Sequence, residues 1–119
     1  MSKIEVRKSR ISGRGVFALN DIRKDELIEK VPVLVFSYSE HEDLDKTKLG
    51  DYIYDWDGKG VAVAFGCGSF YNHSYRPNAI CIQQGRYFEY RALKNIAANE
   101  EIQINYNGNP RSRRKIIFG

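Results

Sequence analysis

The sequence predicts a mainly β domain of short strands arranged in small sheets. Short apolar stretches, many of them alternating with polar residues, are separated by glycine-containing turn signals, a pattern typical of β-dominated domains. The 119 residues amount to one domain, and a chain of this length can bury one adequate hydrophobic core. The sequence has no linker, internal repeat or low-complexity segment, so we expect a single domain over residues 1–119.

The N-terminal third of the chain predicts three strands. Residues 4–8 alternate apolar and polar side chains, and a turn containing two glycines leads into a short strand at residues 16–19. Residues 27–36 form the longest apolar run. Pro32 interrupts this run, and because proline donates no backbone hydrogen bond we expect part of the run to lie at an edge or a bulge.

The middle of the chain predicts a loop followed by two hairpins. Residues 37–48 are polar and predict a loop with at most one helical turn. Residues 52–56 and 61–65 flank an Asp-Gly-Lys-Gly turn, and residues 80–82 and 86–91 flank a Gln-Gln-Gly turn. Each of these two pairs therefore predicts an antiparallel hairpin.

The last apolar positions favour a final strand. Ile102, Ile104 and Tyr106 are spaced by two residues, so in a strand their side chains share one face. We therefore expect Ile104 and Tyr106 to lie on the same wall of the domain.

Composition narrows the class of protein. A hydrophobic fraction of 42% and an aromatic fraction of 13% are typical of globular proteins, and no apolar run is long enough to cross a bilayer. The first residues carry charges without the apolar region of a signal peptide. These observations predict an intracellular protein with no membrane partner.

The charge of the chain is unevenly distributed. The formal net charge is +4, yet residues 37–57 hold seven acidic and only two basic side chains. A basic balance favours nucleic acid or anionic surfaces. The acidic segment, in contrast, would repel phosphate and attract a lysine-rich peptide, although for any single carboxylate a solvated loop is the simpler interpretation.

The two cysteines do not predict a metal site. Cys67, His73 and Cys81 are separated by spacings that match none of the usual zinc-ligand patterns. We expect both cysteines to be free thiols, buried or partly buried, and we expect no metal.

The most unusual stretch of the chain is Phe-Tyr-Asn-His-Ser-Tyr-Arg-Pro-Asn at residues 70–78, which predicts a site rather than a regular strand. Asn72-His73-Ser74 matches a glycosylation acceptor, but the chain shows no secretory leader. A catalytic triad is disfavoured because adjacent residues of an extended chain point to opposite sides and no carboxylate lies nearby in sequence. A polar turn fixed by Pro77 and Asn78 remains the alternative when the stretch is considered alone.

Three further segments accompany this stretch, namely Ser-Gly-Arg-Gly-Val-Phe-Ala at residues 12–18, Asp-Tyr-Ile-Tyr-Asp at 51–55 and Asn-Glu-Glu-Ile-Gln-Ile-Asn-Tyr at 99–106. In this order the four segments resemble the motifs of the SET-domain protein-lysine methyltransferases, and they extend over nearly the whole chain. The length is similar to that of the small stand-alone SET proteins of viruses and bacteria. The sequence departs from many members because residue 75 is tyrosine rather than cysteine and no cysteine follows residue 106.

The resemblance implies a β-clip-like SET fold in which the segment after Asn99 threads past the loop of Asn72 and His73, a pseudoknot-like arrangement. It implies transfer of a methyl group from S-adenosylmethionine to a lysine amine, with S-adenosylhomocysteine as product. In the family, cofactor and peptide approach from opposite faces and meet through a narrow channel. Tyr106 is the implied catalytic residue. The implied cofactor-binding residues are Ser12, Gly13, Arg14, Tyr52, Asn72, His73 and Phe118, and the implied lysine channel is formed by Tyr52, Ile104 and Tyr106.

The resemblance also bears on the product. In the family the residue two positions before the catalytic tyrosine limits the space around the lysine, and a tyrosine there restricts the number of methyl groups. Ile104 occupies this position and has no hydroxyl to hold a water. We therefore expect di- or trimethyllysine.

The expected partner is a lysine-containing protein, with a histone tail as one candidate. Two alternatives stay open: a non-catalytic SET-like module that binds peptide or cofactor, and a basic nucleic-acid-binding β domain with Tyr87 and Tyr90 as stacking faces. The acidic centre argues against direct binding of nucleic acid. The sequence leaves open a homodimer and, for a viral protein, a location in the host nucleus.

Overall fold

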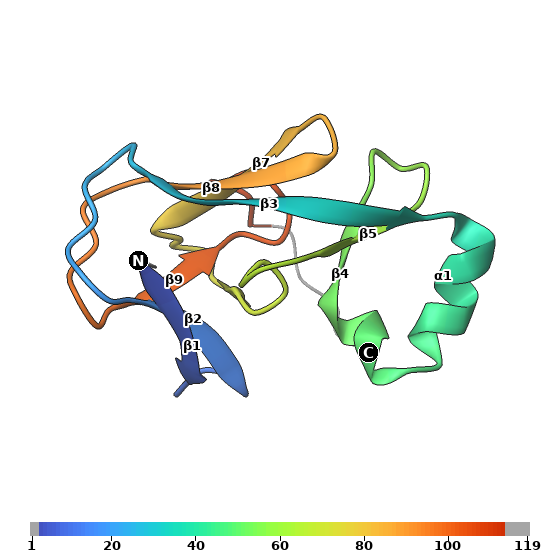
Figure 1. Ribbon diagram of the computed structural model, residues 1–119, viewed down its shortest axis with the longest axis horizontal. Coiled ribbons are helices and arrows are strands. Elements are labelled where there is room, and N and C mark those ends of the chain that lie inside the picture. Colours follow the sequence, from blue (N-terminus) through green and yellow to red (C-terminus); the bar gives the residue numbers. More distant parts are fainter. Residues whose placement is uncertain (1–2, 114–119) are drawn as a thin grey trace.

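The computed structural model describes residues 3–113, which form short strands with one short α-helix and one 3-10 helix (Figure 1). In chain order the elements are β1 (Ile4–Lys8), β2 (Arg14–Ala18), β3 (Leu27–Phe36), α1 (Tyr38–Asp45), η1 (Lys48–Tyr52), β4 (Ile53–Asp55), β5 (Val61–Ala64), β6 (Asn72–His73), β7 (Ala79–Gln84), β8 (Tyr87–Ala92) and β9 (Glu101–Ile104). They form one sheet with the order β1-β2-β9-β6 and another with the order β4-β5-β3-β8-β7. The prediction of a mainly β domain of small sheets is confirmed.

The four-stranded sheet brings distant parts of the chain together. β1 and β2 form an antiparallel hairpin whose turn contains Gly13 at φ 46, a left-handed conformation that favours glycine. β9 pairs antiparallel with β2 on one side and parallel with β6 on the other, with Asn72 opposite Gln103 and His73 opposite Ile104. The segment after Asn99 therefore lies beside the Asn72-His73 loop, as expected.

β3 is the central strand of the five-stranded sheet and changes partner along its length. Its first part pairs with β8 as far as Pro32, and its last four residues pair with β5. Pro32 thus lies at the change of partner, where its missing amide hydrogen is tolerated. The irregular register falls between Leu27 and Glu29, so the run contains a bulge as one of the two expected forms, although the irregularity lies some residues before Pro32.

The segment predicted as a loop at residues 37–48 contains the two-turn helix α1. Ser37 accepts a hydrogen bond from the backbone N–H of Glu40, and the Glu40 carboxylate accepts one from the backbone N–H of Ser37. This reciprocal capping box stabilises the first turn of a helix without any apolar periodicity. The helix has no buried residue, which is why the hydrophobic pattern did not reveal it.

Other boundaries differ by a few residues. The two predicted hairpins form as β4–β5 and β7–β8, and the strand predicted at residues 16–19 is β2, shifted toward the N-terminus. Tyr52 ends η1 and does not begin a strand, because a 3-10 helix capped by Thr47 occupies that segment. β9 ends at Ile104, so Tyr106 lies in the turn that follows it. No helix between residues 3 and 113 is long and apolar enough to span a membrane.

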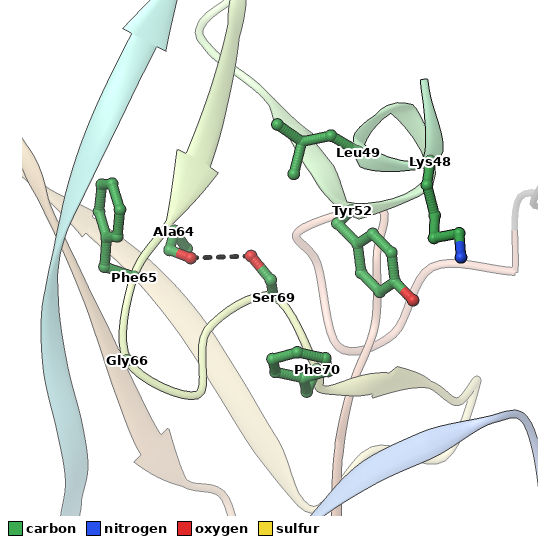
Figure 2. Close-up of a pocket in the computed structure, with 8 residues that line it drawn as sticks. All are labelled: Lys48, Leu49, Tyr52, Ala64, Phe65, Gly66, Ser69 and Phe70. Atoms are coloured by element: carbon green, nitrogen blue, oxygen red, sulfur yellow. Dashed lines mark hydrogen bonds between the residues drawn. The ribbon is translucent and has the colours of Figure 1, made fainter. Parts of the chain in front are cut away.

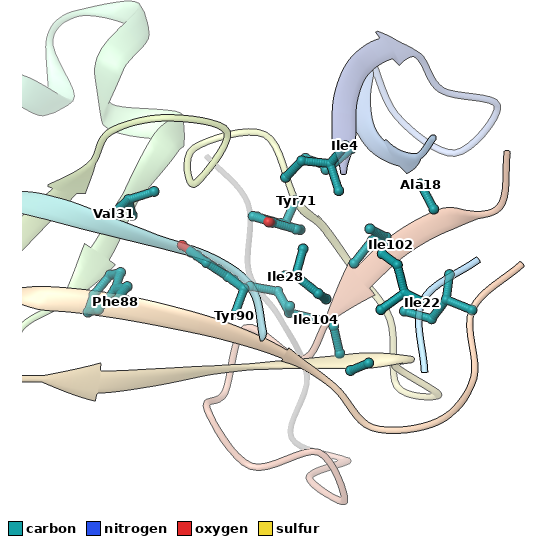
Figure 3. Close-up of a cluster of buried hydrophobic side chains, with 14 of the residues drawn as sticks. Ile4, Ala18, Ile22, Ile28, Val31, Tyr71, Phe88, Tyr90, Ile102 and Ile104 are labelled. Carbon is teal, nitrogen blue, oxygen red and sulfur yellow. The ribbon is translucent and has the colours of Figure 1, made fainter. Parts of the chain in front are cut away.

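The hydrophobic core is shared by the two sheets. Figure 3 shows Ile4, Ala18 and Ile102 of the first sheet on one side of the cluster, with Val31, Phe88 and Tyr90 of the second sheet extending from it. Complete burial of a large aliphatic or aromatic side chain contributes about 1.5–3 kcal/mol. The core therefore holds β9, and with it the start of the turn that carries Tyr106, against the rest of the domain.

Candidate active site

Asn72 fixes the glycine turn between β1 and β2. Its Nδ2 lies 3.1 Å from the carbonyl oxygen of Ser12 and 3.2 Å from that of Arg14, and it also donates to Oε2 of Glu101 over 2.9 Å. The other Glu101 oxygen accepts from the Ser9 hydroxyl over 2.7 Å. The amide nitrogen of Asn72 thus positions the turn that the family resemblance assigns to the cofactor.

Gly15 is required by the same arrangement. A Cβ at this position would collide with the Glu101 carboxylate and would lie 3.1 Å from Nδ2 of Asn72. At Gly13, in contrast, a Cβ would meet no atom within 4 Å. The turn is therefore packed tightly against Glu101 on one side and open at its tip.

His73 accepts a hydrogen bond at Nδ1 from the backbone N–H of Tyr106, with 3.0 Å between the two nitrogens. A neutral imidazole that accepts at Nδ1 carries its proton at Nε2. This Nε2 atom is buried and has no hydrogen-bond partner among residues 3–113. Burial lowers the pKa of His73 below its ordinary value of 6.5, which favours the neutral ring.

The Tyr106 hydroxyl donates to the backbone carbonyl of Tyr71 over 2.6 Å. Because its hydrogen points to this carbonyl, toward any other group the phenol oxygen acts as an acceptor. Burial, followed by the negative charge of Glu101 and the nearby Tyr52 phenol, raises the pKa of Tyr106 to about 12. The phenol is therefore neutral at physiological pH, while 42% of the residue is still exposed.

Ile104 and Tyr106 do not share a strand face as predicted. Ile104 is 1% exposed and packs in the core, whereas Tyr106 lies beyond the end of β9 and is 42% exposed. The alternation fails because the chain leaves the strand at Asn105, which is itself buried. The two side chains nevertheless line one cavity.

That cavity, the Tyr106 pocket, has a volume of about 250 Å³. Its lining comes from β4 and the turn after it, from β7 and β8, and from the end of β9 and the turn that follows. The lining residues are Tyr54, Asp55, Asp57, Cys81, Gln83, Phe88, Ile104, Asn105, Tyr106, Asn107 and Gly108. Cys81, like Cys67, is a free and partly exposed thiol, as expected. Aromatic and aliphatic side chains thus meet two carboxylates in one pocket.

A second cavity, the Tyr52 pocket, has a volume of about 380 Å³ and is lined by Lys48, Leu49, Tyr52, Ala64, Phe65, Gly66, Ser69 and Phe70 (Figure 2). The rings of Tyr52 and Phe70 have centroids 5.8 Å apart, and the Arg14 guanidinium lies 4.7 Å above the Phe70 ring. These contacts connect the pocket to the glycine turn. Of the three residues assigned to the lysine channel, Tyr52 therefore lines one cavity and the other two line another.

Sequence reasoning missed several residues of the site. Glu101, Phe70 and Tyr71 lie inside the matched motifs, so their positions were visible although their contacts were not. Leu49 and Ser69 lie outside these motifs, and the sequence gives no signal that they line a cavity. Phe118 lies outside the described residues.

The described residues fit a cationic cofactor that carries a hydrogen-bond acceptor. The tip of the turn at Gly13 is open, the buried Nε2–H of His73 has no acceptor among residues 3–113, and Glu101 supplies negative charge beside Tyr106. Within residues 3–113, no three His, Cys, Asp or Glu side chains are grouped so that they could hold a metal ion.

Comparison with known proteins agrees with this arrangement. The SET domain family model matches residues 13–107. A Schizosaccharomyces pombe protein named histone-lysine N-methyltransferase, H3 lysine-37 specific, is 40% identical over 108 residues, which cover 88% of this chain and 74% of that protein.

Solved structures are similar over most of the chain. The crystal structure of a proposed histone methyltransferase of Plasmodium falciparum matches with a TM-score of 0.74 and 32% identity, over 89% of this chain and 94% of that one. An inhibitor-bound humanized mutant of Chaetomium thermophilum Polycomb Repressive Complex 2 matches with a TM-score of 0.75 at 21% identity, over 91% of this chain and 15% of that one, a likeness of fold alone. Since the family model spans most of the sequence and two relatives exceed 30% identity, the chain belongs to the SET-domain protein-lysine methyltransferase family.

Proposed function

We propose that this protein transfers a methyl group from S-adenosylmethionine to a lysine of a histone, with Tyr106 as the catalytic residue. The observation that carries the proposal is the double anchoring of Tyr106, through its backbone N–H to His73 and through its hydroxyl to the Tyr71 carbonyl. The name of the fission yeast relative supports a histone as the substrate.

SET methyltransferases use S-adenosylmethionine, and here the turn of Ser12 to Arg14, Tyr52, Asn72 and His73 would hold it. Asn72 and Glu101 hold the turn in place, and the Nε2–H of His73 is a hydrogen-bond donor for a bound group. When bound, the cofactor supplies the methyl group and a sulfonium charge that lowers the pKa of a lysine beside it.

The lysine must arrive as a neutral amine. With a reference pKa near 10.4, presenting the neutral form at pH 7 costs about 4–5 kcal/mol. Tyr106 stays protonated because its pKa is raised to about 12, and the Glu101 carboxylate is occupied by Ser9 and Asn72. We therefore assign lysine deprotonation to desolvation and the neighbouring positive charge, with the proton released to solvent.

The Tyr106 pocket suits the substrate side. Asp55 and Asp57 place two carboxylates on its lining, one accepting from the backbone N–H of Gly58 over 3.0 Å and the other from the Gln83 amide over 3.2 Å. Carboxylates that remain exposed attract a basic segment and steer its approach. This charge favours a lysine-rich peptide over nucleic acid.

Ile104 lines the same pocket and brings no hydroxyl, which favours more than one methyl transfer. We therefore include di- or trimethyllysine in the proposal.

The experiment that tests the proposal is incubation with isotopically labelled S-adenosylmethionine and histone octamers, followed by mass spectrometry of the modified lysine. We expect label on a histone lysine. Cofactor binding without transfer to histones or to any protein of a cell extract would support the non-catalytic module. Salt-sensitive binding of nucleic acid without cofactor binding would support the nucleic-acid alternative.

A further inference from the structure

Glu29 lies in β3 and has a carboxylate that faces the interior of the domain. Its Oε1 accepts a hydrogen bond from the Tyr71 hydroxyl over 2.9 Å. Among residues 3–113 no Lys, Arg or His nitrogen forms an ion pair with it. Burial raises the pKa of this carboxyl group above its ordinary value of 4.5. Burying a carboxylate without a cation costs free energy unless hydrogen bonds to the carboxylate offset that cost. Glu29 therefore depends on the groups that donate hydrogen bonds to it.

The chain is shaped to bring this carboxylate close to the loop before β6. Gly66 has φ 62, and a Cβ there would lie 2.7 Å from Cγ1 of Val31 and 3.1 Å from Oε2 of Glu29. The backbone N–H of Cys67 points to the same oxygen at 3.5 Å, the outer limit of a hydrogen bond. The absence of a side chain at residue 66 thus lets the loop pack directly on Glu29.

The Tyr71 ring is clamped between these contacts and a second network. Tyr71 is 2% exposed and stacks on Tyr90 with 4.2 Å between ring centroids and 17° between planes (Figure 3). The Tyr90 hydroxyl donates to that of Tyr54 over 3.0 Å, and the Tyr54 hydroxyl donates to the Gly68 carbonyl over 2.6 Å. Stacking fixes the plane of the Tyr71 ring, whereas Glu29 fixes the position of its hydroxyl end.

Tyr71 is also the residue whose backbone carbonyl receives the Tyr106 hydroxyl. The three residues therefore form one chain of contacts from Glu29 through the Tyr71 phenol and backbone to Tyr106. We infer that Glu29 is a positioning residue for the reaction, which acts through Tyr71 to hold the Tyr106 phenol oxygen in its productive place. The inference rests on the proposed function, because it presupposes that Tyr106 is catalytic.

The test uses Tyr71→Phe and Glu29→Ala, which remove the two ends of the first contact and leave the Tyr71 carbonyl in place. We expect kcat to fall about 10-fold in each, since small displacements of reacting groups have effects of this size or larger. We expect KM for cofactor and for peptide to change by less than roughly twofold, because the substitutions would displace the Tyr106 phenol oxygen but leave the groups that bind cofactor and peptide in place. The kcat of the double variant should be no lower than that of either single variant, since each substitution removes the same hydrogen bond between Glu29 and the Tyr71 hydroxyl.

The matched control is Tyr90→Phe, which removes a buried hydroxyl from the neighbouring network and keeps the stacked ring. We expect a lower Tm in this variant with kcat close to that of the wild type. Equal kcat losses in Tyr90→Phe and Tyr71→Phe would show that Glu29 contributes only to general packing, which contradicts the inference. Additive kcat losses in the double variant would show that Glu29 and Tyr71 act independently, which also contradicts it.

Unchanged kcat in Tyr71→Phe, measured beside an active wild type, overturns the inference and leaves the proposed function intact. A wild type without transferase activity on any protein overturns the proposed function itself, and the inference with it.

Discussion

The backbone N–H of Tyr106 donates to Nδ1 of His73 over 3.0 Å, a contact between residues 33 positions apart in the chain. The parallel pairing of β6 with β9 brings the two together. The contact makes His73 a structural support of the implied catalytic residue, in addition to a candidate donor toward the cofactor.

We predict that His73→Ala and Asn72→Ala lose affinity for the cofactor. The first removes the buried Nε2–H and the anchor of Tyr106, and the second releases the turn at Ser12 from β6. Titration calorimetry with S-adenosylhomocysteine measures the loss. His41→Ala is the matched control, because His41, the other histidine of the sequence, lies on α1 and pairs with Asp45. Wild-type affinity in well-folded Asn72 and His73 variants would refute the assignment.

Tyr106→Phe should keep the fold and bind cofactor but lose most of its turnover. The substitution removes the phenol oxygen and its bond to the Tyr71 carbonyl, while the backbone contact with His73 remains. Loss of a positioned polar group in a reaction site costs roughly 100-fold or more in kcat. Single-turnover kinetics check this expectation, with Tyr87→Phe as a control for loss of an exposed phenol. A kcat within a few-fold of the wild type would exclude a catalytic role for this oxygen.

Stability should fall as the medium becomes mildly acidic, and His73 should contribute to the fall. Its folded pKa is lowered from 6.5 by burial, so the unfolded chain binds a proton at a pH where the folded chain does not. The stability that the neutral ring contributes is therefore complete above pH 6.5 and is lost as pH falls through the folded pKa. Chemical unfolding of the wild type and His73→Gln from about pH 7 to about pH 5 measures this. The advantage of the wild type should shrink on acidification, and a constant difference would contradict the prediction.

Ile104→Tyr should shift the product toward monomethyllysine. A tyrosine would bring a hydroxyl and extra volume into the Tyr106 pocket, which measures about 250 Å³. Mass spectra of a lysine peptide at long incubation decide between one, two and three methyl groups. Ile104→Val keeps an aliphatic side chain and should give the wild-type distribution. A wild-type reaction that stops at one methyl group would show that Ile104 does not set the limit.

Asp55→Asn and Asp57→Asn should raise KM for a basic peptide and leave kcat nearly unchanged. Each removes one exposed negative charge from the lining of the Tyr106 pocket. Exposed charge pairs contribute about 0.2–1 kcal/mol, so the rise in KM should be at most about fivefold for each and smaller at high salt. Asp43→Asn removes a comparable charge from α1, where Asp43 pairs with Lys46. An equal rise in that control would point to net charge and not to the pocket.

The prediction of β structure from the sequence was accurate where local patterns decide structure. Residues 4–8 and 27–36 became β1 and β3 with the same bounds, and both expected hairpins formed. The second hairpin turns at Gly85 and Arg86, because Gln83 and Gln84 of the expected turn pair with β8. Alternation of side chains and turn residues act over a few positions, so they can be read without knowledge of the fold. The capping box of Ser37 and Glu40 is also a local motif that the sequence contains. Helix α1 was nevertheless not predicted, because it buries no residue and so lacks the apolar periodicity by which helices are recognised.

The sequence by itself determined the family and singled out Asn72, His73 and Tyr106 as candidate site residues, because the four matched segments follow one another in the order of the family's motifs. Only the tertiary structure decided what these side chains contact. The amide of Asn72 bonds to the turn of Ser12 and to Glu101, and Tyr71 connects Glu29 with Tyr106. Such contacts join residues tens of positions apart through strand pairing, and no local pattern encodes them. The end of β9 at Ile104 was decided in the same way, because packing of Asn105 into the interior overrode the alternation that the sequence continues to Tyr106.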